Sequence, residues 1–172
     1  RSSGLLVDFG TPARNKYTLG DWKTGWRGNY QEDGVTFSYV EGRAARVFVN
    51  LLPDEAGAGK VVIRARSMSG NLARGRVYLN GKMAGNMEFS KSFDHGIVDV
   101  SNLVQGANEI LLRFDKSAKA HDGRGAKLAV DYLRVIPSSA DESNAASSID
   151  SFVGASSASQ PKVIALRSGE SL

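Results

Sequence analysis

Aromatic and polar side chains are concentrated in one segment near the start of the chain. Its sequence is Trp22-Lys23-Thr24-Gly25-Trp26-Arg27-Gly28-Asn29-Tyr30, in a chain with only 8% aromatic residues. Flat rings stack on the apolar face of a pyranose, and neighbouring polar groups bond its hydroxyls. This segment, expected to be a loop, therefore predicts a carbohydrate site made by Trp22, Trp26, Arg27, Asn29 and Tyr30. The alternative is that Trp22 or Trp26 folds over one end of a hydrophobic core.

Four arginines alternate with apolar residues in two segments that are expected to be strands. If Val61, Ile63 and Ala65 face a core, Arg64 and Arg66 face solvent, and the same alternation applies to Arg74 and Arg76. We expect these strands to pair, which would bring the four guanidinium groups onto one face: Arg64, Arg66, Arg74 and Arg76. Guanidinium forks suit sulfate and carboxylate, so this face predicts an anionic polysaccharide as partner. The alternative is a solvated sheet face balanced by acids such as Glu109.

Catalytic chemistry is not expected of this chain. Its two histidines, His95 and His121, lie in polar turns beside glycines, without a neighbouring nucleophile motif. The absence of cysteine excludes disulfides, Cys-based zinc sites and a thiol nucleophile. The 22 Lys and Arg residues are balanced by 18 Asp and Glu residues, so the mixed surface does not favour nucleic acid. No apolar run is long enough to cross a membrane.

Short segments with strand character, separated by turn residues, position the aromatic, polar and arginine side chains of the two predicted sites. They predict an all-β, antiparallel sandwich or barrel of about nine strands, without a helix of useful length. The strands are expected at residues 5–9, 35–40, 46–51, 61–65, 76–80, 82–89, 96–100, 109–114 and 128–136. The strongest local signal is Asn80-Gly81 between two of them, because both residues tolerate the positive φ of a tight hairpin turn.

The composition changes after Pro137. Residues 138–160 are mostly Ser and Ala, which predicts a flexible linker. Residues 161–172 then form either one more strand or the start of a following domain, and we favour the following domain because it explains the linker.

The segment 5–137 resembles the galactose-binding-domain-like jelly roll, the β-sandwich of many carbohydrate-binding modules. The resemblance rests on the hairpin at 77–85, the Gly-x-Asn element at 99–110, the closing strand at 128–135 and the opening strand at 6–10. It implies a non-catalytic carbohydrate-binding or substrate-targeting accessory module, as found ahead of bacterial sulfatase-like or glycosidase catalytic domains. Its partner would be a catalytic domain of the same polypeptide, which would be secreted, periplasmic or on the cell surface. The alternative is a structural sandwich that docks on such a domain and has no ligand.

The resemblance also implies a structural calcium ion. Related sandwiches often hold Ca²⁺ where the first and last strands meet, which here would bring together Asp8 and Asp131. The alternative is that Asp8 forms a turn and Asp131 is a hydrogen-bonded residue of the closing strand.

Overall fold

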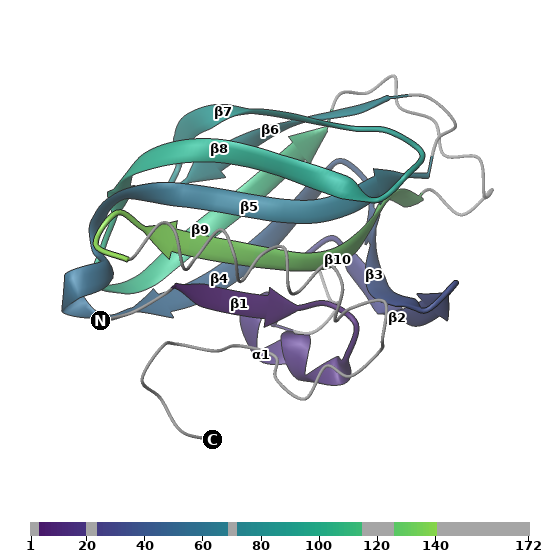
Figure 1. The fold of residues 1–172 in the computed structure, drawn as a ribbon, viewed down its shortest axis with the longest axis horizontal. Coiled ribbons are helices and arrows are strands. Elements are labelled where there is room, and N and C mark those ends of the chain that lie inside the picture. The colour runs from purple at the N-terminus through teal and green to yellow at the C-terminus, as the bar shows by residue number, and fades with distance from the viewer. Residues whose placement is uncertain (1–3, 20–23, 69–71, 115–125, 141–172) are drawn as a thin grey trace.

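Two β-sheets make up the part of the chain that the structure describes (Figure 1). The computed structural model describes residues 4–19, 24–68, 72–114 and 126–140, and these form ten strands and three short helical turns. The strands are β1 (Leu5–Asp8), β2 (Trp26–Glu32), β3 (Val35–Glu41), β4 (Ala44–Leu51), β5 (Gly57–Ser67), β6 (Ala73–Leu79), β7 (Lys82–Phe89), β8 (Asp94–Leu103), β9 (Gly106–Phe114) and β10 (Ala126–Pro137). The helical turns are η1 (Pro12–Arg14), α1 (Asn15–Thr18) and η2 (Pro53–Glu55).

All strand pairs are antiparallel. One sheet has six strands in the order β2-β3-β10-β5-β8, with β1 pairing with the second half of β10. The other has four strands in the order β4-β9-β6-β7. The predicted all-β jelly-roll sandwich is confirmed. The strand missing from the prediction is β2, which covers residues expected to lie in a loop.

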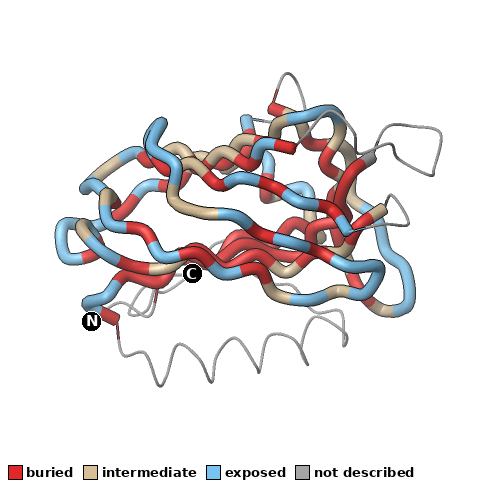
Figure 2. The backbone as a smooth tube through the Cα atoms, turned by 90° about the horizontal axis from the view of Figure 1, so that it is seen from above, coloured by how far each residue is buried: buried red, intermediate tan, exposed pale blue. Residues whose placement is uncertain are grey.

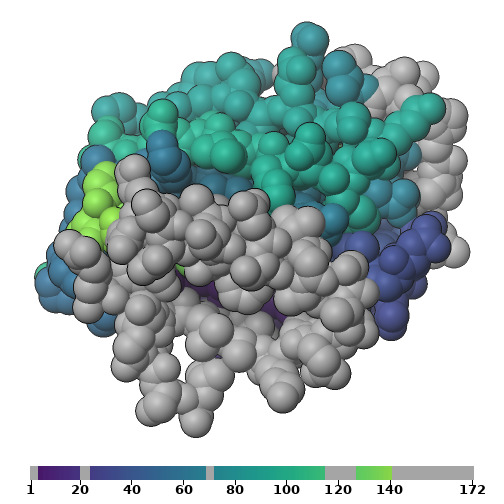
Figure 3. All heavy atoms as spheres, viewed as in Figure 1, coloured from purple at the N-terminus to yellow at the C-terminus, as the bar shows by residue number. Residues whose placement is uncertain are grey.

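The core lies between the two sheets. Buried and exposed residues alternate along most strands (Figure 2), because successive side chains of a strand point to opposite faces. Val61, Ile63 and Ala65 of β5 and Val77 and Leu79 of β6 face this core, as predicted. In Figure 1 the strands β8, β5, β10 and β1 of the six-stranded sheet lie in front of the four-stranded sheet, whose strand β7 runs along the top. In Figure 3 the upper surface has the teal of β7 and β8.

The Asn80-Gly81 turn and the Gly-x-Asn turn before β9 meet at one end of the sandwich. Asn80 and Gly81 form the turn between β6 and β7 with φ of 51° and 83°. The Asn80 amide donates to Oδ1 of the buried Asn108 at 3.0 Å, and the Glu109 N–H donates to Asn80 Oδ1 at 2.9 Å. The Asn108 side chain also accepts from the N–H of Val104 and donates to its carbonyl, closing the turn that precedes β9. These amides fasten the hairpin to the Gly-x-Asn turn.

The prediction that the two arginine-bearing strands pair is wrong. The hydrogen-bonding edges of β5 are taken by β10 and β8, and the chain after β5 crosses to the other sheet, where β6 pairs with β7 and β9. Arg64 and Arg66 therefore lie on the outer face of the six-stranded sheet, and Arg74 and Arg76 on that of the four-stranded sheet. The four guanidinium groups do not share a face.

The helical turns are short. Within the described ranges, no helix is long and apolar enough to cross a membrane. β10 ends at Pro137, and the predicted linker at 138–160 and the segment 161–172 lie, apart from residues 138–140, outside the described residues. The domain division of the chain therefore remains a prediction.

Candidate functional site

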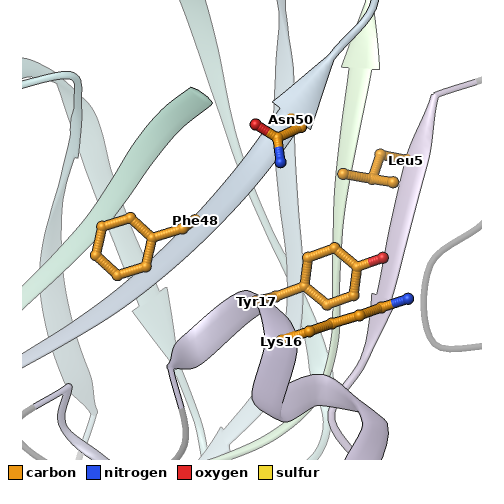
Figure 4. Close-up of a pocket in the computed structure, with 5 residues that line it drawn as sticks. All are labelled: Leu5, Lys16, Tyr17, Phe48 and Asn50. Atoms are coloured by element: carbon orange, nitrogen blue, oxygen red, sulfur yellow. The ribbon is translucent and has the colours of Figure 1, made fainter. Parts of the chain in front are cut away.

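A hollow of about 330 Å³ lies where α1 packs against β4 and the start of β1. We refer to it as the α1–β4 hollow, and it is lined by Leu5, Lys16, Tyr17, Phe48 and Asn50. Figure 4 shows Lys16 and Tyr17 projecting from the helical turn, and Phe48 and Asn50 projecting from β4. The Lys16 ammonium lies 5.1 Å from the centroid of the Tyr17 ring. Residues with two aromatic rings, an amide and an ammonium group thus line one open space.

The elements on both sides of this hollow are held in place by buried groups. A four-residue helix has little stability of its own, so α1 depends on tertiary contacts. Arg14, only 1% exposed, supplies them: its guanidinium donates to Ser38 Oγ at 3.0 Å, Thr18 Oγ1 at 2.9 Å and the Gly28 carbonyl at 3.0 Å. On β4, the residues Val47 and Val49 face the core, so the alternation turns Phe48 and Asn50 outward.

Sequence reasoning missed all five lining residues. The signal was present on β4, where Phe48 is an aromatic residue at a position whose neighbours, Val47 and Val49, face inward. Lys16 and Tyr17 gave no such signal, because α1 is too short to show a helical period.

Residues 26–30 of the predicted aromatic platform belong to strand β2, and Trp26 is part of the core. Trp26 is 2% exposed, its ring stacks on Phe9 at 4.2 Å between centroids, and its indole N–H donates to the Arg46 carbonyl at 2.8 Å. The Asn29 amide donates to the Phe9 carbonyl at 3.0 Å. Both side chains therefore hold the sandwich together, with Trp26 buried and Asn29 half-buried. Trp22 lies outside the described residues.

The local backbone explains this difference. Gly28 has a φ of 59°, and the pairing of β2 with β3 shifts register between Arg27 and Tyr30, as at a β-bulge. The bulge breaks the simple alternation of a strand. Trp26 points inward opposite Val40 and Arg27 outward opposite Tyr39, and the bulge places Tyr30 on the same outer face, opposite Phe37.

Arg27 and Tyr30 meet the first two predicted arginines on the outer face of the six-stranded sheet. We call this cluster the aromatic–arginine face; its members are Arg27, Tyr30, Phe37, Tyr39, Arg64, Arg66 and Phe93. The guanidinium carbons of Arg27, Arg64 and Arg66 lie 5.0 to 5.4 Å from the ring centroids of Tyr39 or Phe93. The cluster thus combines two residues of the predicted carbohydrate site, Arg27 and Tyr30, with two of the predicted arginine face, Arg64 and Arg66.

Acidic residues accompany these arginines. Arg27 pairs with Glu41, Arg64 with Asp131, and Arg66 with Glu32 at 2.6 Å. Each guanidinium group on this face thus already contacts a carboxylate. That arrangement matches the alternative of a charge-balanced sheet face better than an anion-binding site.

Asp8 and Asp131 lie side by side, as the topology predicted. The Phe9 N–H donates to the Asp131 carbonyl at 2.9 Å, and Asp8 Oδ1 accepts from the Gly10 N–H at 2.8 Å. Burial raises the pKa of Asp8 to about 6, and the nearby Asp131 adds to this, while the bond from Gly10 opposes it. Burial also lowers the pKa of Arg134 on the same strand as Asp131, an effect that Tyr132 opposes.

The described side chains around this pair do not by themselves make up a calcium site. Ca²⁺ takes six to eight oxygen ligands. In the described part of the chain, no group of three or more His, Cys, Asp or Glu residues could hold a metal ion. The carboxylate of Asp131 is paired with Arg64, so Asp8 has no second free carboxylate beside it. Calcium binding therefore remains a prediction from the resemblance alone.

The side chain of His95 contacts a tyrosine. Its imidazole Nε2 lies 2.6 Å from the hydroxyl of Tyr132, across the outer face of the six-stranded sheet. The other histidine, His121, lies outside the described residues.

No protein-family model matches the chain, and no curated protein sequence matches it. Solved structures do match. The C-terminal family 6 carbohydrate-binding module of LamC, a marine laminarinase from Zobellia galactanivorans, is 10% identical with a TM-score of 0.50. The match covers 76% of this chain and 97% of that one.

Two other structures are similar. An exo-β-1,3-galactanase from Phanerochaete chrysosporium, solved with β-1,3-galactotriose, is 12% identical with a TM-score of 0.51, over 77% of this chain and 29% of that one. A family 35 carbohydrate-binding module from an environmental isolate is 17% identical with a TM-score of 0.49, over 78% of this chain and 93% of that one. The matches with TM-scores of 0.50 and 0.51 show that the chain has the same jelly-roll fold as the family 6 carbohydrate-binding module.

Proposed function

We propose that this protein is a non-catalytic module that binds carbohydrate in the α1–β4 hollow. The observation that carries the proposal is the lining of that hollow: the rings of Tyr17 and Phe48 beside the amide of Asn50 and the ammonium of Lys16. Aromatic rings offer a sugar its stacking surface, and amide and ammonium groups bond its hydroxyls. The site replaces the predicted platform at Trp26, which is buried.

The size and exposure of the hollow support a saccharide ligand. A space of about 330 Å³ is at the lower end of the range for small-molecule sites, which suits one or two sugar residues. Phe48 is half-buried, and Asn50 and Lys16 are exposed, so these groups are accessible without rearrangement of the core. An open site of this kind gives weak affinity, which attachment to a substrate-bound neighbour would raise through effective concentration.

The test is binding of neutral oligosaccharides, first on a glycan array and then by titration calorimetry with the best ligand. Phe48→Ala is expected to weaken binding at least roughly tenfold, because stacking and burial of one ring contribute about 1.5 to 3 kcal/mol. Asn50→Ala should weaken it by a smaller factor. Ile97→Ala is the matched control, since Ile97 is 57% exposed on the other sheet. Binding that survives Phe48→Ala, or an array without any ligand, contradicts the proposal.

A docking function is the second candidate, and the aromatic–arginine face favours it. Rings and guanidinium groups lie next to one another there, and Tyr30 is 36% exposed beside Tyr39 and Arg27. Aromatic and arginine residues are enriched at protein interfaces. A partner of the same polypeptide, such as a sulfatase-like or glycosidase catalytic domain, would cover this face. The array result separates the two candidates, because a docking domain needs no glycan.

The wider context is part of the proposal. The fold is common in accessory modules of hydrolases, which supports a larger hydrolytic protein that acts on polysaccharide outside the cytoplasm. Export of that protein and the identity of its catalytic domain follow from the resemblance alone.

A further inference from the structure

A row of apolar side chains crosses the outer face of the four-stranded sheet. Leu111 of β9 lies directly opposite Tyr78 of β6, and Tyr78 lies directly opposite Met83 of β7. Phe48 of β4 is a diagonal neighbour of Leu111, because it lies opposite Glu109, two residues earlier on β9. Each strand of this sheet thus contributes one residue to what we call the apolar row: Phe48, Leu111, Tyr78 and Met83.

The apolar row is accessible from solvent. Met83 is 47% exposed, and the other three side chains are half-buried. Their sequence neighbours on β4, β6 and β9 belong to the core between the sheets, so alternation turns the row outward: Val47, Val49, Val77, Leu79, Ile110 and Leu112. Exposed apolar residues that adjoin one another and have polar residues around them mark binding surfaces, whereas single exposed ones are ordinary.

Polar side chains border the apolar row on both sides. On β9, Glu109 and Arg113 are each two residues from Leu111, so they take the same face, one on either side of it. Glu109 contacts Arg46 of β4 at 3.8 Å, with the two side chains 38% and 40% exposed. A carboxylate accepts hydrogen bonds and a guanidinium group donates them, so both borders are able to bond sugar hydroxyls. Apolar side chains between such groups are the arrangement expected of a saccharide site.

The apolar row is continuous with the α1–β4 hollow, because Phe48 belongs to both. Figure 4 shows its ring projecting from β4. Since neighbouring strands lie about 4.8 Å apart, the row extends roughly 14 Å from β4 to β7, about the length of three sugar residues in an extended chain. A stable protein interface takes about 800 Å² from each partner, which is much wider than one row of four side chains bordered by charged groups. Its shape therefore favours a narrow, linear ligand over a protein.

We propose that the apolar row extends the α1–β4 hollow into a binding surface for a linear, neutral polysaccharide, so that the module recognises a stretch of chain. This inference rests on the proposed function of the hollow. One sugar residue would stack on Phe48, and the next residues of the chain would contact Leu111, Tyr78 and Met83 as they cross the sheet. A straight row suits an extended chain better than a coiled one, which defines the ligand class further.

The test is a chain-length series of cello-, laminari- and xylo-oligosaccharides, from disaccharide to hexasaccharide, measured by titration calorimetry. For the series that binds, the affinity of the wild type should rise about tenfold or more with length, because longer chains reach Tyr78 and Met83. Tyr78→Ala should remove about that factor for the hexasaccharide and leave the disaccharide unchanged. Met83→Ala should act in the same direction with a smaller factor.

Ile97→Ala is the matched control, because it removes an exposed aliphatic side chain from the other sheet, and it should leave the whole series unchanged. Equal affinity of the wild type for disaccharide and hexasaccharide would overturn the inference. So would unchanged hexasaccharide binding in the Tyr78→Ala, Met83→Ala double variant. In both cases the proposed function survives if Phe48→Ala still weakens disaccharide binding, and if it does not, both proposals fail.

Sedimentation velocity tests the other occupant of this face, a second copy of the chain. The wild type and Tyr78→Ala are both expected to sediment as monomers. A wild-type dimer that Tyr78→Ala converts into a monomer would assign the apolar row to a contact between two copies and overturn the inference.

Discussion

Replacement of Trp26 by alanine distinguishes a structural tryptophan from a ligand platform. In the structure its ring is 2% exposed and stacks on Phe9, so Trp26→Ala removes core packing. The indole also caps an open strand edge: β4 is an edge strand, and the Arg46 carbonyl accepts the indole N–H at 2.8 Å. Loss of the side chain therefore leaves both a cavity and a carbonyl without this partner.

The expected cost is large. Trp-to-Ala changes in cores cost about 3 to 5 kcal/mol, and loss of the part-buried hydrogen bond to the Arg46 carbonyl adds up to about 1 kcal/mol. Because small domains have a total stability of only about 5 to 15 kcal/mol, Trp26→Ala should unfold at a much lower denaturant concentration, or be unfolded at 25 °C. Trp26→Phe keeps most of the ring and loses the hydrogen bond, so it should cost about 1 to 2 kcal/mol.

Urea unfolding followed by circular dichroism measures both variants, and glycan binding is measured on whatever remains folded. The structural assignment requires Trp26→Phe to bind the glycan as the wild type does. A Trp26→Ala protein with a free energy of unfolding within about 1 kcal/mol of the wild type, but without glycan binding, would refute the reasoning. It would place the indole at the ligand.

Two further predictions concern buried polar groups. Folding raises the pKa of Asp8 from 3.8 to about 6. The protonated Asp8 therefore contributes its full stabilisation below pH 3.8, and this contribution is lost as the pH rises through about 6. Asp8→Asn, which can still accept the Gly10 N–H, should therefore raise the free energy of unfolding at pH 7 by up to about 3 kcal/mol and change it little at pH 4; a pH-independent difference in urea titrations would contradict this. Asn108→Ala leaves the backbone of Val104 without its amide partner, so it should cost about 2 to 3 kcal/mol and speed hydrogen exchange at Val104. Unchanged exchange there would show that the turn does not need the amide.

Alternation and turn chemistry made most of the fold predictable. The Asn80-Gly81 turn needs positive φ at both residues, which few other pairs tolerate, so its position could be read directly. The core-facing residues of β5 and β6 could be predicted because side chains of a strand alternate between its two faces. The pairing of β5 with β10 and β8 did not follow, because alternation fixes which face a residue takes and says nothing about which strand lies beside it.

The candidate site was harder to predict for the same reason. Trp26 and Arg27 are neighbours in sequence, yet one is in the core and the other is on the outer face, and the bulge at Gly28 then places Tyr30 beside Arg27. The α1–β4 hollow combines residues of β1, a four-residue helix and an edge strand. No local pattern connects Tyr17 with Phe48, since tertiary packing alone brings them together.

The place of β10 in the six-stranded sheet has a consequence for the order of folding. The last described strand pairs with β1, β3 and β5, so it is central to a sheet whose other strands are made earlier. On the ribosome, β1 has no partner until residues near Val135 emerge, whereas β4, β9, β6 and β7 can pair sooner. Such long-range pairing is slow because a long loop must close first. During synthesis, the four-stranded sheet should therefore form before the six-stranded sheet is complete, so part of its inner apolar face stays uncovered until β10 arrives.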